Sequence, residues 1–135
     1  MRGRPATGLV LLRQPPATAS TPGAAPIVMA FADCRHRATH CTPQKWRQRA
    51  VADWVEYLEG NLTEEADRRA GTRPDTEQRT HNARRSVGAR PCFDLAECVG
   101  HFEIPPLIWR STYIESLRRR TIDSAILIND FCARL

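Results

Sequence analysis

Several features that mark common protein classes are missing from this chain of 135 residues. The longest apolar run near its start covers residues 9–12, which is too short for the core of a signal peptide or for a membrane span. Strand signals are nearly absent, and there are no internal repeats. A hydrophobic fraction of 41% and a charged fraction of 26% are ordinary, so a fibrous, collagenous or wholly disordered chain is excluded.

Lysine is also scarce, and so are acidic residues near the N-terminus. Lys45 is the only lysine among the 20 basic residues, and the scattered arginines indicate a bias towards G+C-rich codons. The formal net charge of +5 permits binding of nucleic acid or phosphate but does not argue for it. Residues 1–32 contain no acidic residue and are rich in Ala, Pro, Thr and Arg. We therefore predict that residues 1–25 are disordered, although a transit peptide or translated non-coding DNA would have the same composition.

The five cysteines form no recognisable framework. An odd number without a signal peptide favours reduced thiols and a cytoplasmic location. Cys34, His36, His40 and Cys41 are residue types that bind zinc. Their spacing matches no standard finger, and four ligands within eight residues of one helix would not converge on a tetrahedral site, so we do not predict zinc.

Helical periodicity begins at residue 26 and predicts an all-α fold. A short helix is expected over about 27–40, and a long one follows to Ala70, with Thr42 as N-cap and Pro43 at its first position. Gly71 ends the long helix, and Gly60 in its middle indicates close packing or a bend. Its apolar stripe contains Val51, Val55, Leu58, Leu62 and Ala66, widened by Trp46, Trp54 and Tyr57.

Two shorter helices and a final long one complete the pattern. A polar helix over about 75–87 is broken by Gly88 and Pro91, and a helix over about 92–102 follows. Such a break exposes unpaired carbonyls before it and free N–H groups after it. Ser111 is expected to cap the last helix. The residues expected to face inward are Leu95, Ala96 and Val99 in the fourth helix, and Ile114, Leu117, Ala125 and Ile128 in the last.

Short motifs follow one another along residues 26–135. They are Trp54-x-x-Tyr57-Leu58-x-Gly60, Ala66-x-x-Arg69-x-Gly71-x-x-Pro74, Arg84-x-x-x-Gly88-x-x-Pro91, Asp94-Leu95-x-Glu97, Phe102-Glu103-Ile104-Pro105 and Asn129-Asp130. In order and spacing this series resembles the class I terpene synthases of bacterial type. The resemblance implies the middle helices of that all-α fold, truncated at both ends, without the half that carries the aspartate-rich motif.

The resemblance implies Mg²⁺-dependent ionisation of a prenyl diphosphate, followed by cyclisation of the carbocation. Magnesium prefers oxygen ligands, which the family draws from a DDxxD-like stretch and from an NDxxSxxxE motif. Asn129 matches the first ligand of the second motif. Ala133 stands where the family has Ser or Thr, the Glu would lie two residues beyond Leu135, and no Asp-Asp pair occurs. Asn129 is therefore the one metal ligand that we expect, and it cannot hold magnesium alone.

The same resemblance assigns two roles around the helix break. Arg84 resembles the diphosphate-sensing arginine, because it lies four residues before Gly88, whose carbonyl would face the forming cation. A guanidinium suits diphosphate through its fixed fork of donors. Arg85 is an alternative register. The tyrosine often found a few residues upstream is not seen, since Arg79 and Thr80 stand there.

Simpler interpretations accompany each assignment. Asn129 could be a hydrogen-bonded core asparagine, Arg84 part of a solvated face and Gly88 an ordinary helix C-cap. We predict a terpene synthase fragment that is inactive by itself. Two alternatives are a non-catalytic helical protein that associates through uncovered apolar faces, and a basic nucleic-acid-binding module whose patch includes the run of arginines at 118–120.

Overall fold

A computed structural model describes residues 26–40 and 42–132, and the described part is helical, without strands. The predicted disorder of residues 1–25 lies outside the described residues. The all-α prediction is confirmed. In chain order the helices are α2 (Pro26–Thr39), α3 (Gln44–Ala70), α4 (Thr76–Ser86), α5 (Ala89–Gly100), α6 (Pro106–Trp109) and α7 (Thr112–Cys132).

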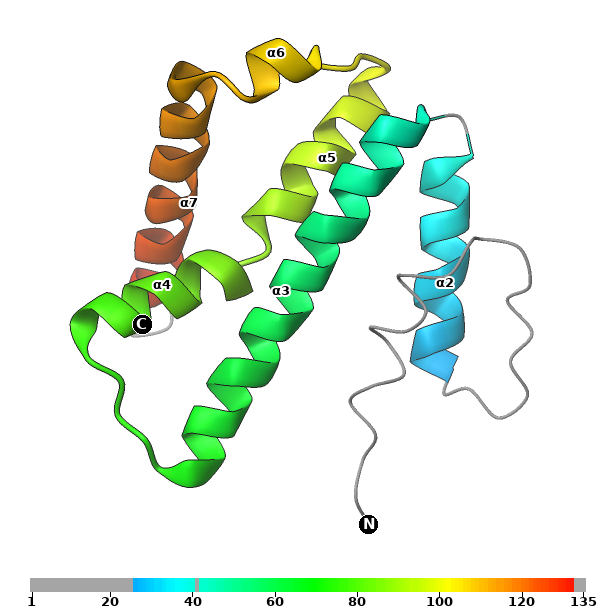
Figure 1. Cartoon of the computed structure of the whole chain (residues 1–135). Coiled ribbons are helices and arrows are strands. Elements are labelled where there is room, and N and C mark those ends of the chain that lie inside the picture. The colour runs from blue at the N-terminus through cyan, green and yellow to red at the C-terminus, as the bar shows by residue number, and fades with distance from the viewer. Residues whose placement is uncertain (1–25, 41, 133–135) are drawn as a thin grey trace.

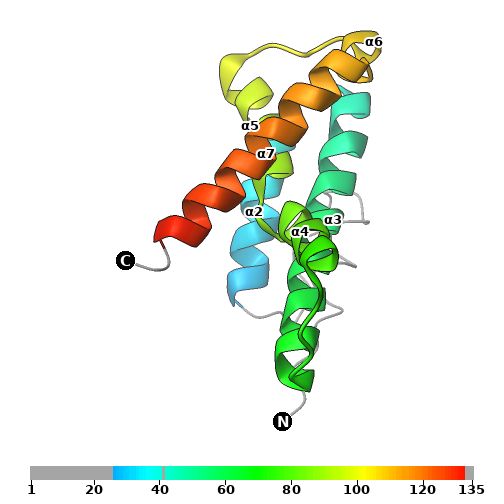
Figure 2. The ribbon, with the colours of Figure 1, turned by 90° about the vertical axis from the view of Figure 1, so that its left-hand side faces the viewer.

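The long helix α3 organises the other helices around it (Figure 1). Helix α2 lies on one side of α3, and α4 and α5 pack on another part of its surface. Helix α7 runs back past α5 and α4, and α6 joins the far end of α5 to the start of α7. Figure 2 shows the C-terminal turns of α7 projecting away from the other helices.

The start of α3 differs from the sequence prediction. Pro43, in an extended conformation, is the N-cap, and the first helical residue is Gln44. The Thr42 hydroxyl instead donates to the carbonyl of Thr39, at the C-terminal end of α2. Thr42 therefore satisfies an orphan carbonyl of the preceding helix rather than an amide of the following one. At its other end α3 terminates as expected, with Gly71 in the left-handed region at φ 66°.

Gly60 marks the close packing of α3 against α4. A Cβ built at this position would lie 2.8 Å from the Cβ of Arg85 and 3.0 Å from the backbone nitrogen of Ser86. Gly60 is buried, so the absent side chain lets the backbones of α3 and α4 approach. Asp75 then begins α4 by accepting a hydrogen bond from the Gln78 amide, as an N-cap should.

The inward face of α5 is polar, which contradicts the sequence prediction. Val99 is 79% exposed, and Leu95 and Ala96 are also exposed. The buried side chains are instead those of Asp94 and Glu97. The helix also begins earlier than expected, at Ala89, with Gly88 as its N-cap. The prediction followed the apolar residues, but the face that meets α3 is held by charged groups.

Helix α7 shows a similar difference. Ser111 caps it as predicted, because its hydroxyl accepts a hydrogen bond from the Ile114 amide. Its buried residue is Ile122, whereas Leu117 and Ile128 of the predicted inner face are exposed.

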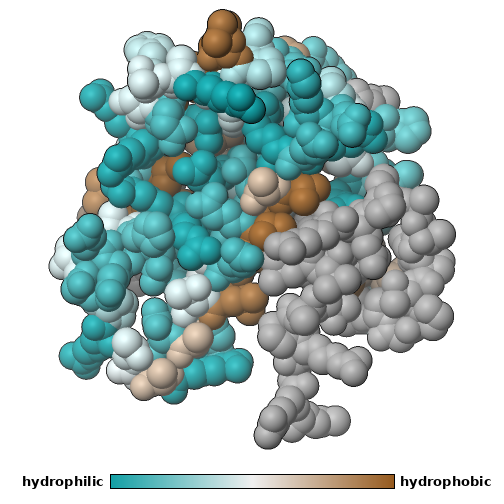
Figure 3. All heavy atoms as spheres, in the orientation of Figure 1, coloured by the Kyte–Doolittle hydropathy of each residue, from teal (hydrophilic) through white to brown (hydrophobic). Residues whose placement is uncertain are grey.

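Large apolar side chains remain at the surface of the described helices. The face in Figure 3 is mainly hydrophilic but carries apolar patches. None of the described helices combines the length and the apolar character needed to cross a membrane. The most exposed apolar residues are Ile27, Val99, Leu107, Tyr113, Leu127, Ile128 and Phe131.

Candidate functional site

Arg84, the predicted diphosphate-binding residue, lies in the last turn of α4 and faces α7. Its Nε donates to Oδ1 of Asp123 over 2.7 Å, and its Nη2 donates to Oδ2 over 3.1 Å. Two parallel bonds of this kind fix the guanidinium plane. The side chains of Arg84 and Asp123 are 31% and 38% exposed, so solvent reaches both. We call Arg84 and Asp123 the surface pair.

The hydrogen bonds within the surface pair favour the charged forms of both Arg84 and Asp123. Hydrogen bonding to Asp123 raises the pKa of the Arg84 guanidinium. The same hydrogen bonds lower the pKa of the Asp123 carboxyl below its ordinary value. Both groups are therefore charged at neutral pH, and Arg84 is already arranged to bind an anion with two oxygens in one plane.

Gly88 lies at the break between α4 and α5, as predicted. Its φ of 77° is in the left-handed region, and a Cβ there would come within 3.3 Å of the Tyr57 ring. Both the conformation and the contact favour glycine. The Gly88 carbonyl accepts the Cys92 amide over 3.4 Å as the first bond of α5, which leaves a second lone pair for another donor or a cation.

Arg85, the alternative for the diphosphate role, turns towards α3 instead of α7. Its Nη2 lies 3.5 Å from Oε2 of Glu59. The neighbouring Ser86 carbonyl accepts a hydrogen bond from the Asn61 amide over 3.4 Å. These contacts fasten the end of α4 to α3, and they leave Arg84 as the arginine of the two that faces α7.

Asn129, the predicted metal ligand, is exposed and lies three residues before the end of α7 at Cys132. It is therefore not a buried core asparagine in this structure. Among the described residues no three His, Cys, Asp or Glu side chains lie close enough together to hold a metal ion. Cys41, of the dismissed zinc pattern, and Ala133 both lie outside the described residues.

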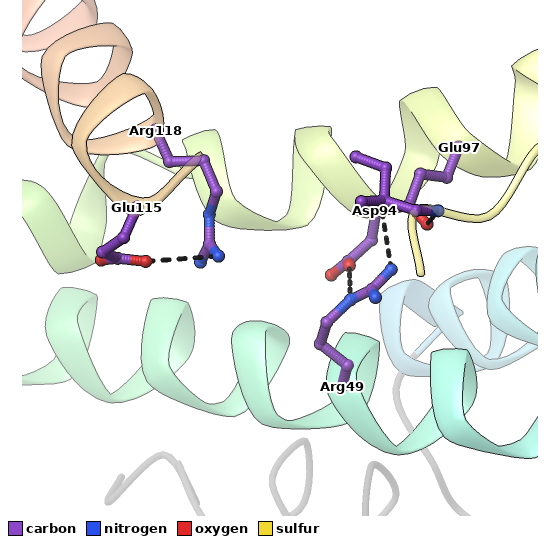
Figure 4. A network of polar contacts seen from close by, with 6 residues as sticks. Arg49, Asp94, Glu97, Glu115 and Arg118 are labelled. Atoms are coloured by element: carbon purple, nitrogen blue, oxygen red, sulfur yellow. Dashed lines mark hydrogen bonds and ion pairs between the residues drawn. The ribbon is translucent and has the colours of Figure 1, made fainter. Parts of the chain in front are cut away.

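A buried polar layer joins α3 to α5, and its arginine stands in none of the sequence motifs. Arg49 Nε donates to Oδ1 of Asp94 over 2.9 Å, and its Nη2 donates to Oε1 of Glu97 over 2.7 Å (Figure 4). The second Glu97 oxygen accepts the Ile104 amide. Asp94 is 1% exposed and Glu97 2%. We call Arg49, Asp94 and Glu97 the polar layer.

Trp109 extends the polar layer to α7. Two guanidinium groups lie over its ring, that of Arg49 at 4.0 Å from the ring centroid and that of Arg118 at 4.2 Å. Arg118 also pairs with Glu115 over 3.3 Å (Figure 4). Such stacking stabilises a cation over an aromatic face. Because Arg118 turns inward, the three arginines at 118–120 do not form one continuous basic patch.

The chemistry of the polar layer identifies it as a packing device rather than an open site. Burial raises the pKa of Asp94 to about 7, and the neighbouring Asp53 adds to this effect while Arg49 opposes it. Burial also raises the pKa of Asp53. The Asp94-x-x-Glu97 spacing was the available sequence signal, since residues three apart share a helix face. Arg49 is brought to these two acids by the fold.

Known proteins are similar to this chain in sequence and in the arrangement of their helices. Residues 9–133 match the family model described as terpene synthase family 2, C-terminal metal binding. The chain belongs to this terpene synthase family. The match includes both sides of the helix break, the polar layer and Asn129, and its description agrees with a metal as cofactor.

The curated relatives of this terpene synthase family member are bacterial enzymes. The chain is 39% identical over 113 residues to R-linalool synthase of Streptomyces clavuligerus, a match that covers 84% of this chain and 34% of the relative. It is 31% identical over 127 residues to a (−)-β-caryophyllene synthase of Saccharothrix espanaensis, covering 94% of this chain and 36% of the relative. The chain therefore spans about a third of the length of these relatives.

Solved structures extend the similarity to the fold of the terpene synthases. The linalool/nerolidol synthase of Streptomyces clavuligerus superposes with a TM-score of 0.87 at 37% identity, over 94% of this chain and 43% of that chain. A second structure of that enzyme, in complex with 2-fluorogeranyl diphosphate, gives the same TM-score and identity. The helices described here thus form part of a class I terpene synthase fold.

Proposed function

We propose that this chain supplies the diphosphate-sensing part of an enzyme that ionises and cyclises a prenyl diphosphate with Mg²⁺, and that the chain alone does not catalyse this reaction. The observation that carries the proposal is the surface pair. Its planar guanidinium holds Asp123 through two donors, is partly exposed to solvent, and lies four residues before the helix break at Gly88. Membership of the terpene synthase family supplies the reaction class.

Arg84 would act by exchanging partners. A diphosphate oxygen pair has the same two-acceptor geometry as the Asp123 carboxylate but carries more negative charge. A diphosphate that approaches Arg84 therefore competes with Asp123 for Nε and Nη2 without requiring a new guanidinium orientation. The partial exposure of both side chains gives an anion access to these donors.

Gly88 and Asn129 have supporting roles in this proposal. The Gly88 carbonyl has a lone pair beyond the bond to Cys92 and would stabilise positive charge near the break. Asn129 would contribute one amide oxygen to Mg²⁺. That donor set does not fit a complete magnesium site, because one neutral oxygen is too few and Ala133 carries no side-chain oxygen. The residues of this chain therefore cannot hold the metal by themselves.

The names of the relatives support the substrate class and the setting. The Saccharothrix relative is named as a farnesyl diphosphate cyclising enzyme, and the Streptomyces enzyme was solved with a geranyl diphosphate analogue. Both are prenyl diphosphates. A cytoplasmic location is part of the proposal, and it is supported by the free thiols of Cys34, Cys92, Cys98 and Cys132 among the described residues.

The direct test incubates the purified chain with geranyl, farnesyl and geranylgeranyl diphosphates and Mg²⁺. We expect no cyclic terpene by gas chromatography and mass spectrometry. Formation of a cyclic product above trace level would contradict the proposal that the chain alone is inactive.

Grafting this segment into a complete relative tests the diphosphate role of Arg84, because the relative supplies the metal ligands that this chain lacks. Residues 26–135 would replace the matching segment of the Streptomyces clavuligerus enzyme, with and without Ala133→Ser. We expect the graft with serine to ionise geranyl diphosphate faster than the graft with alanine, and Arg84→Gln to abolish the gain. If the serine graft were equally active with and without the Arg84→Gln change, Arg84 would have no diphosphate role.

A second candidate function is association through uncovered apolar faces. The observation that favours it is the cluster of exposed apolar residues near the end of α7, namely Leu127, Ile128 and Phe131. Exposed apolar patches mark interaction sites or aggregation hazards. Size-exclusion chromatography with light scattering would test it. A concentration-independent monomer would exclude self-association, whereas a shift to larger species that Leu127→Ser with Phe131→Ser reverses would support it.

A further inference from the structure

Many charged groups meet where α3, α5 and α7 pack together. The polar layer supplies one guanidinium for two nearly fully buried carboxyl groups. Arg90 lies 3.6 Å from Glu56 and 4.0 Å from Glu115, and its charge also opposes the effect of burial on the pKa of Asp53. The charged groups around this region are Arg49, Asp53 and Glu56 of α3, Arg90, Asp94 and Glu97 of α5, and Glu115 and Arg118 of α7. Arg35 of α2 and Arg47 of α3 line a cavity that also borders Asp94.

Asp53 of α3 and Asp94 of α5 are neighbouring acids in this region. Asp53 lies one helical turn after Arg49 on α3, and hydrogen bonding between the Asp53 and Asp94 side chains contributes to the pKa of both carboxyl groups. Asp53 is 8% exposed and Asp94 1%. Asp94 Oδ1 accepts a hydrogen bond from Arg49 Nε. Asp94 Oδ2 is buried and meets no hydrogen-bond donor among the described residues.

Two ionised carboxylates cannot hydrogen bond to each other, because neither carries a proton to donate. Burial of like charges in contact is also costly, and one proton between them removes that cost. A proton held by this pair also fits the buried Asp94 Oδ2 atom, which meets no hydrogen-bond donor within the described part of the chain. A single proton thus accounts for the burial of both acids and agrees with the unpartnered oxygen.

We propose that Asp53 and Asp94 share one proton between α3 and α5, so that the packing of these two helices is a pH-sensitive contact that weakens towards alkaline pH. The device is separate from the surface pair and does not depend on the proposed reaction. It acts on α5 and, through Arg49 and Trp109, on the connection to α7.

The direction of the pH effect follows from where the proton is bound. Burial first, and then Asp53, raise the pKa of Asp94 to about 7 in the folded chain, whereas an unfolded Asp titrates near its ordinary value of 3.8. Between these values the folded chain holds a proton that the unfolded chain has released. The stability that this proton contributes is therefore fully present below the unfolded value and is lost as pH rises towards about 7, where the folded pair also ionises.

The first test observes the proton directly. The full chain, labelled with ¹³C at the Asp carboxyl carbons, is titrated by NMR from acid to alkaline pH. We expect one resonance pair to shift near neutral pH, and this near-neutral shift to disappear in Asp53→Asn and in Asp94→Asn. Absence of any Asp carboxyl that titrates near neutrality, or its persistence in both variants, would overturn the proposal.

The second test measures stability by urea unfolding across the same pH range. One proton taken up on folding changes the unfolding equilibrium constant by up to about tenfold per pH unit. We expect Asp53→Asn to flatten this dependence, because the amide donates permanently where the shared proton would. Asp67→Asn on the same helix is the matched control and should keep the full slope. The four histidines are exposed and common to all variants. An unchanged slope in Asp53→Asn would overturn the proposal.

Discussion

The polar layer and the surface pair use the same chemistry in opposite surroundings. Each holds an arginine of one helix to carboxylates of another, with bonds of 2.7 to 3.1 Å. The Arg49 side chain is 18% exposed and its partners 1% and 2%, whereas Arg84 and Asp123 are 31% and 38% exposed. Burial therefore separates an arginine that is committed to packing from one that an anion can still reach.

This difference has an energetic reason. Removing one member of a buried ion pair leaves an uncompensated charge away from water, so the desolvation of the remaining groups is no longer offset. A solvent-exposed pair contributes little, because water and salt replace the lost partner. An arginine that must release its carboxylate for a diphosphate can do so at the surface but not in the polar layer.

The largest predicted effect is the loss of Arg49. We expect Arg49→Met to lower the free energy of unfolding by about 3–5 kcal/mol, since Asp94 and Glu97 lose their shared cation. Urea unfolding monitored by circular dichroism measures the change. Arg84→Met is the matched control and should show only a small part of this loss. Equal losses in the two variants would erase the distinction between the two arginines.

A smaller effect is expected at the contact that holds α4 in place. Gly60→Ala puts a Cβ into the backbone of α4, and such overpacking costs about 1–3 kcal/mol. Ala52→Gly, at an exposed position of the same helix, gives the helix-propensity term alone. Thermal unfolding of both variants separates the two contributions. A stabilising Gly60→Ala change would show that α4 can move away from α3 at no cost, and would weaken the fixed placement of Arg84.

The smallest effect on stability is expected at the surface pair. Asp123→Asn removes a charge that is stabilised by Arg84, and hydrogen bonding lowers the pKa of this Asp. Its contribution is present above the ordinary Asp range and is lost as pH falls through the lowered pKa. We expect a slight decrease in melting temperature at pH 7 and none at a pH below that value. A large decrease at pH 7 would indicate that Asp123 is structural and not exchangeable.

The sequence predicts the helices better than it predicts their faces. Ends such as Gly71, Asp75 and Ser111 follow from local rules, because the residue that stops or caps a helix acts on its own neighbours. The burial of Asp94 depends on Arg49, which lies 45 residues earlier, and no local pattern reports such a partner. Apolar periodicity therefore assigned Val99 to the interior when the charged side of α5 is the buried one.

In the candidate site, too, local features could be predicted from the sequence, whereas long-range contacts could not. The spacing of Arg84 and Gly88 around the break could be predicted, since it is carried by a short motif within one stretch of chain. The pairing of Arg84 with Asp123, 39 residues away, and the turn of Arg85 towards Glu59 could not. These contacts depend on how α4 packs between α3 and α7.

The most direct test of the contrast between the two arginines is a titration of the full chain with inorganic pyrophosphate, followed by NMR of the arginine Nε–Hε signals. Arg84→Gln and Arg49→Lys assign the two signals of interest. We expect the Arg84 signal to shift with saturation and Asp123→Asn to tighten this binding, while the Arg49 signal stays in place. An unmoved Arg84 signal, or equal shifts at Arg84 and Arg49, would contradict the exchange of partners at the surface pair.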